Sequence, residues 1–177
     1  MRRLVATVLL LVLAGLAPAQ TGTAGNWVKH DSQAGGFTAL FPVMPKEQTE
    51  TKTVAQGDIV SHIFMASSGD FLCLAAYTDY PVDVDTEQEL SMDRDNFAKA
   101  VQATVSDSRR RSLTTDNGDQ FPALDFVATS ANGTFKSVVV LVNRRVYQAA
   151  TFNRKGSDHN ADMERFLASF KVTGKRS

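Results

Sequence analysis

The stretch NGTFKSVVVLVNRRVYQAATF, residues 132–152, decides the fold that we expect for this chain. Asn132-Gly133 is the strongest hairpin signal in the sequence, because both residue types tolerate the positive φ of a type I′ turn. A strand at residues 137–142 follows, apolar from Val138 on, and Asn143-Arg144 turns the chain into another strand at residues 145–152. The segment before the first turn alternates, with apolar side chains at Leu124, Phe126 and Ala128. We therefore predict two consecutive hairpins that form a three-stranded antiparallel meander.

Further strands are predicted on the N-terminal side of this meander. Residues 37–41 lie in GFTALFP, and Pro42 ends that strand because proline cannot donate a ladder hydrogen bond. Residues 46–54 alternate and are rich in Thr, which is typical of a strand that faces solvent. Residues 71–77, FLCLAAY, are almost all apolar and lie between turns, so we expect a strand buried on both faces. A basic strand is predicted at residues 108–114.

Two amphipathic helices are predicted to pack on this sheet. The first spans residues 86–104, where Thr86 and Glu89 fit a capping box. Its apolar face carries Leu90, Phe97, Val101 and Val105. We expect Ser157 or Asp158 to cap the last helix, whose apolar stripe is Met163, Phe166, Leu167 and Phe170. This order predicts an α+β fold, an antiparallel β-sheet with two packed helices, around an interior without ionisable groups.

The N-terminus has the pattern of a secretory signal peptide, which we place at residues 1–19. Arg2 and Arg3 precede an uncharged apolar run at residues 4–16, and Ala17-Pro18-Ala19 is a cleavage signal. The alternative is a membrane anchor, but that run is short against the roughly 20 residues that cross a bilayer. We expect export to the periplasm or beyond, followed by a flexible lead-in at residues 20–26. A single α+β domain would then fill residues 27–172, with a polar tail at 173–177.

Charge and cysteine content exclude several classes of protein. Lys and Arg number 19, as do Asp and Glu, so the net charge is zero, and a dominant nucleic-acid role would need a large basic excess. We expect no membrane span after the leader. The only cysteine, Cys73, rules out an intrachain disulfide framework and a four-cysteine zinc site. Because it lies inside an apolar run, we expect a buried, structural thiol.

Three stretches of the chain resemble one family of exported bacterial domains of uncharacterised function. They are GFTALFPVMP at residues 36–45, NRRVYQAATF at 143–152 and MERFLASFKV at 163–172. In this order they are similar to the PsbP-like (Mog1/PsbP) α-β-α sandwich. The resemblance implies that fold and a non-catalytic role, since the photosystem member assists a metal-containing complex and the nuclear member binds a small GTPase. It assigns no site residue, because none of those members' functional residues can be matched here.

An acidic segment before the first predicted helix is the candidate metal site. Asp79, Asp83 and Asp85 crowd the sequence TDYPVDVD, and calcium or another divalent ion favours several carboxylates on one loop. The alternative is a solvated loop whose charge stabilises the N-terminus of the following helix. The three histidines, His30, His62 and His159, are far apart and follow no ligand spacing. We therefore expect no cofactor, with a divalent ion as the alternative.

The basic run at residues 109–111 is the candidate anion site. In a strand, alternation sends Arg109 and Arg111 to one face and Arg110 to the other. Two arginines on one face can clamp a carboxylate or a phosphate. The alternative is a charged edge strand that resists aggregation.

The function that these features favour is an exported, non-catalytic accessory or binding domain whose partner is a protein or a small ligand. Exposed Trp27, Tyr77 and Tyr80 are candidate partner contacts, because Trp and Tyr dominate binding hot spots; packing at the edge of the core is the alternative. Two other functions stay open. One is a metal-dependent hydrolase that uses the acidic 79–85 loop, and the other is a carrier of a small apolar ligand.

Overall fold

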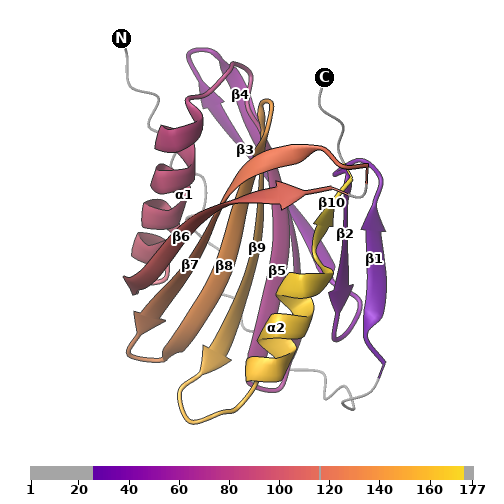
Figure 1. Cartoon of the computed structure of the whole chain (residues 1–177), viewed down its shortest axis with the longest axis vertical. Helices are drawn as coiled ribbons and strands as arrows, with labels where there is room; N and C mark the ends of the chain where they lie inside the picture. Colours follow the sequence, from indigo (N-terminus) through magenta and orange to yellow (C-terminus); the bar gives the residue numbers. More distant parts are fainter. Residues whose placement is uncertain (1–25, 116, 174–177) are drawn as a thin grey trace.

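The structure is a computed structural model that describes residues 26–115 and 117–173 (Figure 1). The predicted leader at residues 1–19 and the lead-in up to residue 25 lie outside the described residues, as does the predicted tail after Thr173. Within the described part, no helix is long and apolar enough to cross a membrane.

The helices are α1 (Thr86–Ala100) and α2 (Asn160–Ser169). The strands are β1 (Val28–Ser32), β2 (Phe37–Phe41), β3 (Lys46–Val54), β4 (Gly57–Ser68), β5 (Phe71–Asp79), β6 (Thr104–Thr114), β7 (Gln120–Ser130), β8 (Gly133–Val142), β9 (Arg145–Arg154) and β10 (Lys171–Val172).

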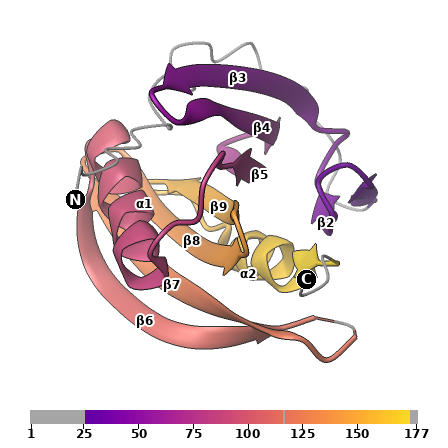
Figure 2. The ribbon, with the colours of Figure 1, turned by 90° about the horizontal axis from the view of Figure 1, so that it is seen from above.

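Seven of these strands form one sheet in the order β3-β4-β5-β9-β8-β7-β6, and every neighbouring pair is antiparallel. The predicted meander is confirmed as β7-β8-β9. The sheet bends strongly between its two edges, as the view in Figure 2 shows from β3 round to β6. The remaining strands form a separate sheet in the order β1-β2-β10, which the sequence did not predict.

The first hairpin of the meander turns one residue earlier than its sequence signal suggests. Ser130 pairs with Gly133, so Ala131 and Asn132 occupy the turn. Asn132 does not adopt a positive φ, and the predicted type I′ turn at Asn132-Gly133 is wrong. Glycine is needed at 133 for a different reason: a Cβ there would lie 2.2 Å from the carbonyl oxygen of Asn153.

Helices cover both faces of the large sheet, which gives three layers. On one face, α1 packs on β6, β7 and β8 around a cluster that contains Leu90, Phe97 and Phe126. On the other face, α2 and the three-stranded sheet cover a second cluster that contains Phe37, Tyr147 and Phe166. The predicted α+β fold, an antiparallel sheet with two packed helices, is confirmed.

The helix ends differ from their predicted positions. Asp85, not Thr86, is the N-cap of α1, and its carboxylate accepts a hydrogen bond from the Gln88 N–H at 2.8 Å. The predicted capping box fails because the Glu89 side chain is used elsewhere, as described below. His159 takes the N-cap position of α2, in place of Ser157 or Asp158, and makes no side-chain capping bond.

Candidate functional site

The face of the large sheet that carries α2 is only partly covered. α2 packs on β2, β5, β8 and β9, and beyond it the same face continues over β7 to the edge strand β6. An open groove of about 430 Å³ lies at this place. We call it the β6 groove; its lining residues are Asp107, Arg109, Arg111, Asp125, Phe126, Val127, Lys136, Ser137, Val138, Leu167 and Ala168.

Alternation along β6 selects which of its arginines reach the groove. Arg109 and Arg111 line it, as predicted for two residues on one face. Arg110 lies on the other face, where its guanidinium contacts α1 at 2.9 Å from the Glu87 carboxylate and 2.8 Å from the Ser91 hydroxyl. β6 is also an edge strand, as the alternative interpretation of this basic run required.

The charges in the β6 groove are arranged around Asp125 of β7. Asp125 is paired across the strands with Arg109, and both of its carboxylate oxygens accept from Nε of Arg111, at 2.9 and 2.7 Å. Arg109 approaches the same carboxylate only to 3.8 Å, and its side chain is 76% exposed. On the α2 side of the groove, Lys136 lies 3.6 Å from Glu164. Arg109 is thus the groove cation least engaged by the protein itself.

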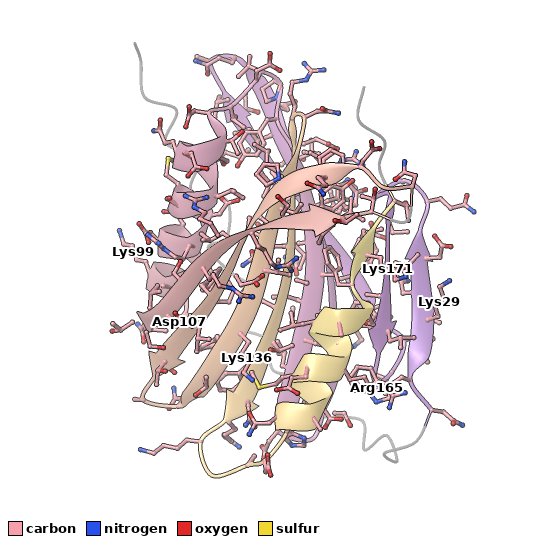
Figure 3. The ribbon with its side chains drawn as sticks, in the orientation of Figure 1. Lys29, Lys99, Asp107, Lys136, Arg165 and Lys171 are labelled. Carbon is pink, nitrogen blue, oxygen red and sulfur yellow. The ribbon has the colours of Figure 1, made fainter. Side chains whose placement is uncertain are left out.

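The groove combines this charge with apolar surface. Val127, Val138 and Leu167 contribute to the lining beside the charged side chains. Its volume lies within the range of about 300–1,000 Å³ that small-molecule sites occupy. Figure 3 labels Asp107 on β6 and Lys136 on β8, two of the charged side chains that line the groove. Chemically, the arrangement suits a carboxylate or another anion that is attached to an apolar group.

The three carboxylates of the predicted metal site have separate positions. Asp79 accepts from Arg145 at 2.6 and 2.8 Å, and Asp85 caps α1. Asp83 is exposed in the loop between them. Over residues 26–115 and 117–173, no three His, Cys, Asp or Glu side chains are grouped so that they could hold a metal ion. The structure therefore does not bring Asp79, Asp83 and Asp85 together as ligands.

Two of the three aromatic residues expected at a partner surface are buried. Tyr77 is 4% exposed and Tyr80 is 5% exposed, so the expectation that they face solvent is wrong. Tyr77 stacks on His62, with ring centroids 4.6 Å apart, and the Arg145 guanidinium lies 4.5 Å from its ring centroid. Trp27 is half-buried, packs against the core and receives the Arg165 guanidinium at 4.7 Å from its ring centroid.

A polar cluster beneath α1 was missed by the sequence interpretation. The Tyr80 hydroxyl donates to the buried Glu89 carboxylate at 2.5 Å, and Asp93 lies one helical turn further along. A small cavity of about 30 Å³ adjoins them, lined by Ser61, Ile63, Ala76, Thr78, Tyr80, Asp93, Asn96, Val146 and Gln148. Burial raises the pKa of Glu89, and burial together with the nearby Glu89 raises the pKa of Asp93 to about 8.

This cluster corrects the expectation of an interior without ionisable groups. A signal for it was present in the sequence. The apolar face of the first helix runs from Leu90 to Phe97, and an amphipathic helix would have apolar residues three and four positions after Leu90. Those positions hold Asp93 and Arg94 instead.

Cys73 is buried as predicted. It is 0% exposed, its thiol donates weakly to the Ala66 carbonyl at 3.7 Å, and burial raises its pKa well above the ordinary range. Each of the three histidines packs on a different aromatic ring: His30 on Phe64, His62 on Tyr77 and His159 on Phe71.

A search of solved structures finds a similar chain. The solution structure of cyanobacterial PsbP (CyanoP) from Synechocystis sp. PCC 6803 matches with a TM-score of 0.53 and 10% sequence identity. The match covers 88% of this chain and 98% of that chain. This chain has a PsbP-like fold. No protein-family model matches the sequence, and no curated protein matches it. The fold implied by the three family-like stretches is thereby confirmed.

Proposed function

We propose that this protein is an exported, non-catalytic accessory domain that binds an anionic group of a ligand or partner in the β6 groove. The observation that carries the proposal is the groove itself, where Arg109, Arg111 and Lys136 line a ligand-sized hollow together with apolar residues. The PsbP-like fold and the signal-peptide pattern of residues 1–19 support an accessory role after export.

The electrostatics of the groove favour an anion over a cation. Three basic side chains line it against two carboxylates, Asp107 and Asp125, and Arg111 already occupies both oxygens of Asp125. An incoming carboxylate at Arg109 would replace water around a side chain that has only one long ion pair. The apolar residues on the α2 side would cover the part of the ligand next to that carboxylate.

The test uses anilinonaphthalene sulfonate, a fluorescent amphipathic anion, with the chain purified after export. We expect saturable binding at one site, weakened about fivefold or more by Arg109→Ala combined with Lys136→Ala, because each exposed ion pair contributes modestly. Lys29→Ala combined with Lys99→Ala removes the same charge from β1 and α1 (Figure 3), at two residues that do not line the groove. Equal affinity for both double variants would overturn the groove as the binding site; thermal melting verifies that each variant is folded.

A further inference from the structure

We propose that the free edge of β6 accepts an extended acidic segment of a partner protein as an additional strand, with its acidic side chains placed over Arg109 and Arg111. This inference rests on the proposed function, because it names the partner class that the β6 groove takes. It adds a backbone contact, the sheet edge, to the side-chain contact of the groove.

The edge of β6 is long and regular enough to pair with another strand. β6 ends the sheet order, and within the described residues its ladder partner is β7 alone. Its register with β7 shifts once, between Val105 and Asp107, and is then continuous to Thr114. Residues 106–112 are all exposed. An edge strand of this kind presents unpaired N–H and C=O groups, which is the template for strand addition.

The side chains beside this edge define the chemistry of the added strand. Arg109 and Arg111 are two residues apart on the groove face, and an added strand repeats its own side chains on that face with the same spacing. Directly opposed side chains on neighbouring strands lie about 5 Å apart, which is within reach of an arginine–carboxylate pair. A segment with acidic residues at the two alternate positions opposite Arg109 and Arg111 therefore matches β6, and one with basic residues at those two positions is repelled. Asp107 lies on the same face, so the position opposite it is not acidic in the matching segment.

Two other occupants fit this edge less well. Neither residues 1–25 nor residues 174–177 contain Asp or Glu, so these two segments do not supply the acidic strand. A second copy that pairs β6 with β6 around a two-fold axis at Arg110 would place the run of residues 109–111 opposite itself, and like charges opposed across strands are destabilising. Charge complementarity thus favours a different, acidic protein.

The experiment measures calorimetric binding of a short capped peptide that alternates glutamate and valine. A peptide with lysine in place of glutamate tests charge, and two further peptides, N-methylated at every glutamate or at every valine, test backbone pairing. Arg109→Glu is compared with Lys29→Glu, the same charge reversal on β1. Hydrogen exchange of the β6 amides, followed with and without peptide, reports pairing at the edge directly.

Four results together are expected. The glutamate peptide binds, the lysine peptide does not, at least one N-methylated peptide loses binding, and Arg109→Glu weakens binding about tenfold while Lys29→Glu does not. Binding that survives both N-methylations, without added protection of β6 amides, would overturn strand addition and leave the groove function standing. Absence of peptide binding, with sulfonate binding retained, would overturn the acidic strand alone. Loss of both would overturn the proposed function as well, and concentration-dependent self-association through β6 would replace the acidic partner with a second copy.

Discussion

At the scale of single residues, Asp93 is a carboxyl group whose surroundings oppose its normal ionisation. It belongs to α1, one turn after Glu89, and no basic side chain lines the small cavity that it adjoins. Burial and the neighbouring carboxylate raise its pKa to about 8, so the folded protein keeps a proton at pH values where the unfolded chain releases it.

The sign of the resulting pH dependence follows from proton linkage. Between about pH 4 and pH 8 the native state binds more protons at Asp93 than the unfolded state, so this residue lowers the free energy of unfolding as pH rises through that window. Asp93→Asn removes the effect. We expect the stability of the variant relative to the original protein to be greater at pH 9 than at pH 5, measured by urea denaturation.

Asp95→Asn is the matched control for Asp93, because Asp95 lies on the exposed side of the same helix and pairs with Arg94. The stability of Asp95→Asn relative to the original protein should be nearly the same at pH 9 and at pH 5. An Asp93→Asn variant whose relative stability is the same at both pH values would contradict the assignment of Asp93 as a protonated, half-buried acid.

Arg145 joins the two sheets through several contacts at once. Its guanidinium binds both oxygens of Asp79, donates to the carbonyls of Ala34 at 2.9 Å and Gly35 at 3.0 Å, and lies over the Tyr77 ring. The contacts with Asp79 and those two carbonyls need the planar fork of an arginine, which lysine does not supply.

Arg145→Lys is therefore expected to lower the free energy of unfolding by about 1.5–3 kcal/mol, the range for hydrogen bonds that involve charged groups. Chemical denaturation measures this change. Arg144→Lys, at the neighbouring exposed position, is the control and should leave stability nearly unchanged. An equal effect at both positions would show that the fork of Arg145 is not what joins the sheets.

At the scale of elements, the start of α1 shows how a correct helix prediction can hide a wrong cap. Thr86 and Glu89 have the spacing of a capping box, but the Glu89 carboxylate accepts from Tyr80, and Asp85 caps the helix instead. Local spacing could not reveal this, because the Tyr80 contact depends on how the chain folds back before the helix.

Asp85→Ala removes the cap and is expected to lower the free energy of unfolding by about 1 kcal/mol. Asp83→Ala, two residues earlier in the same loop, removes an equal charge without removing a cap. Thermal or urea unfolding of the two variants separates the capping bond from the general charge of the loop. A loss at Asp83 as large as that at Asp85 would mean that charge alone acts here.

The same loop allows a direct test of metal binding. Asp79 is engaged by Arg145 and Asp85 by the helix N-terminus, so we expect no heat when millimolar calcium or manganese is titrated into metal-free protein. A saturable heat signal that disappears in Asp83→Asn would contradict this expectation and would support metal binding by the acidic loop.

At the scale of the whole molecule, sequence patterns predicted the contacts between neighbouring segments better than those between distant ones. The meander and the two helices follow from turn signals and periodicity, and the shared face of Arg109 and Arg111 follows from strand alternation. The small sheet does not, because β10 pairs with β2 across most of the chain. The β6 groove also depends on distant contacts: Asp125 meets Arg111 through the β6–β7 register, and α2 stops short of the sheet edge.

The burial of Cys73 allows the opening of the folded protein to be measured by labelling its thiol. Cys73 lies in the cluster that α2 and the small sheet cover, so the single thiol reaches an alkylating reagent only when that layer separates from the large sheet. The rate of its chemical labelling in native buffer should then report global opening rather than local fraying, and should rise in parallel with denaturant-induced unfolding. Mass spectrometry of labelled chains against time measures this rate, and fast labelling of the folded protein would show that α2 and the small sheet separate from the large sheet without global unfolding.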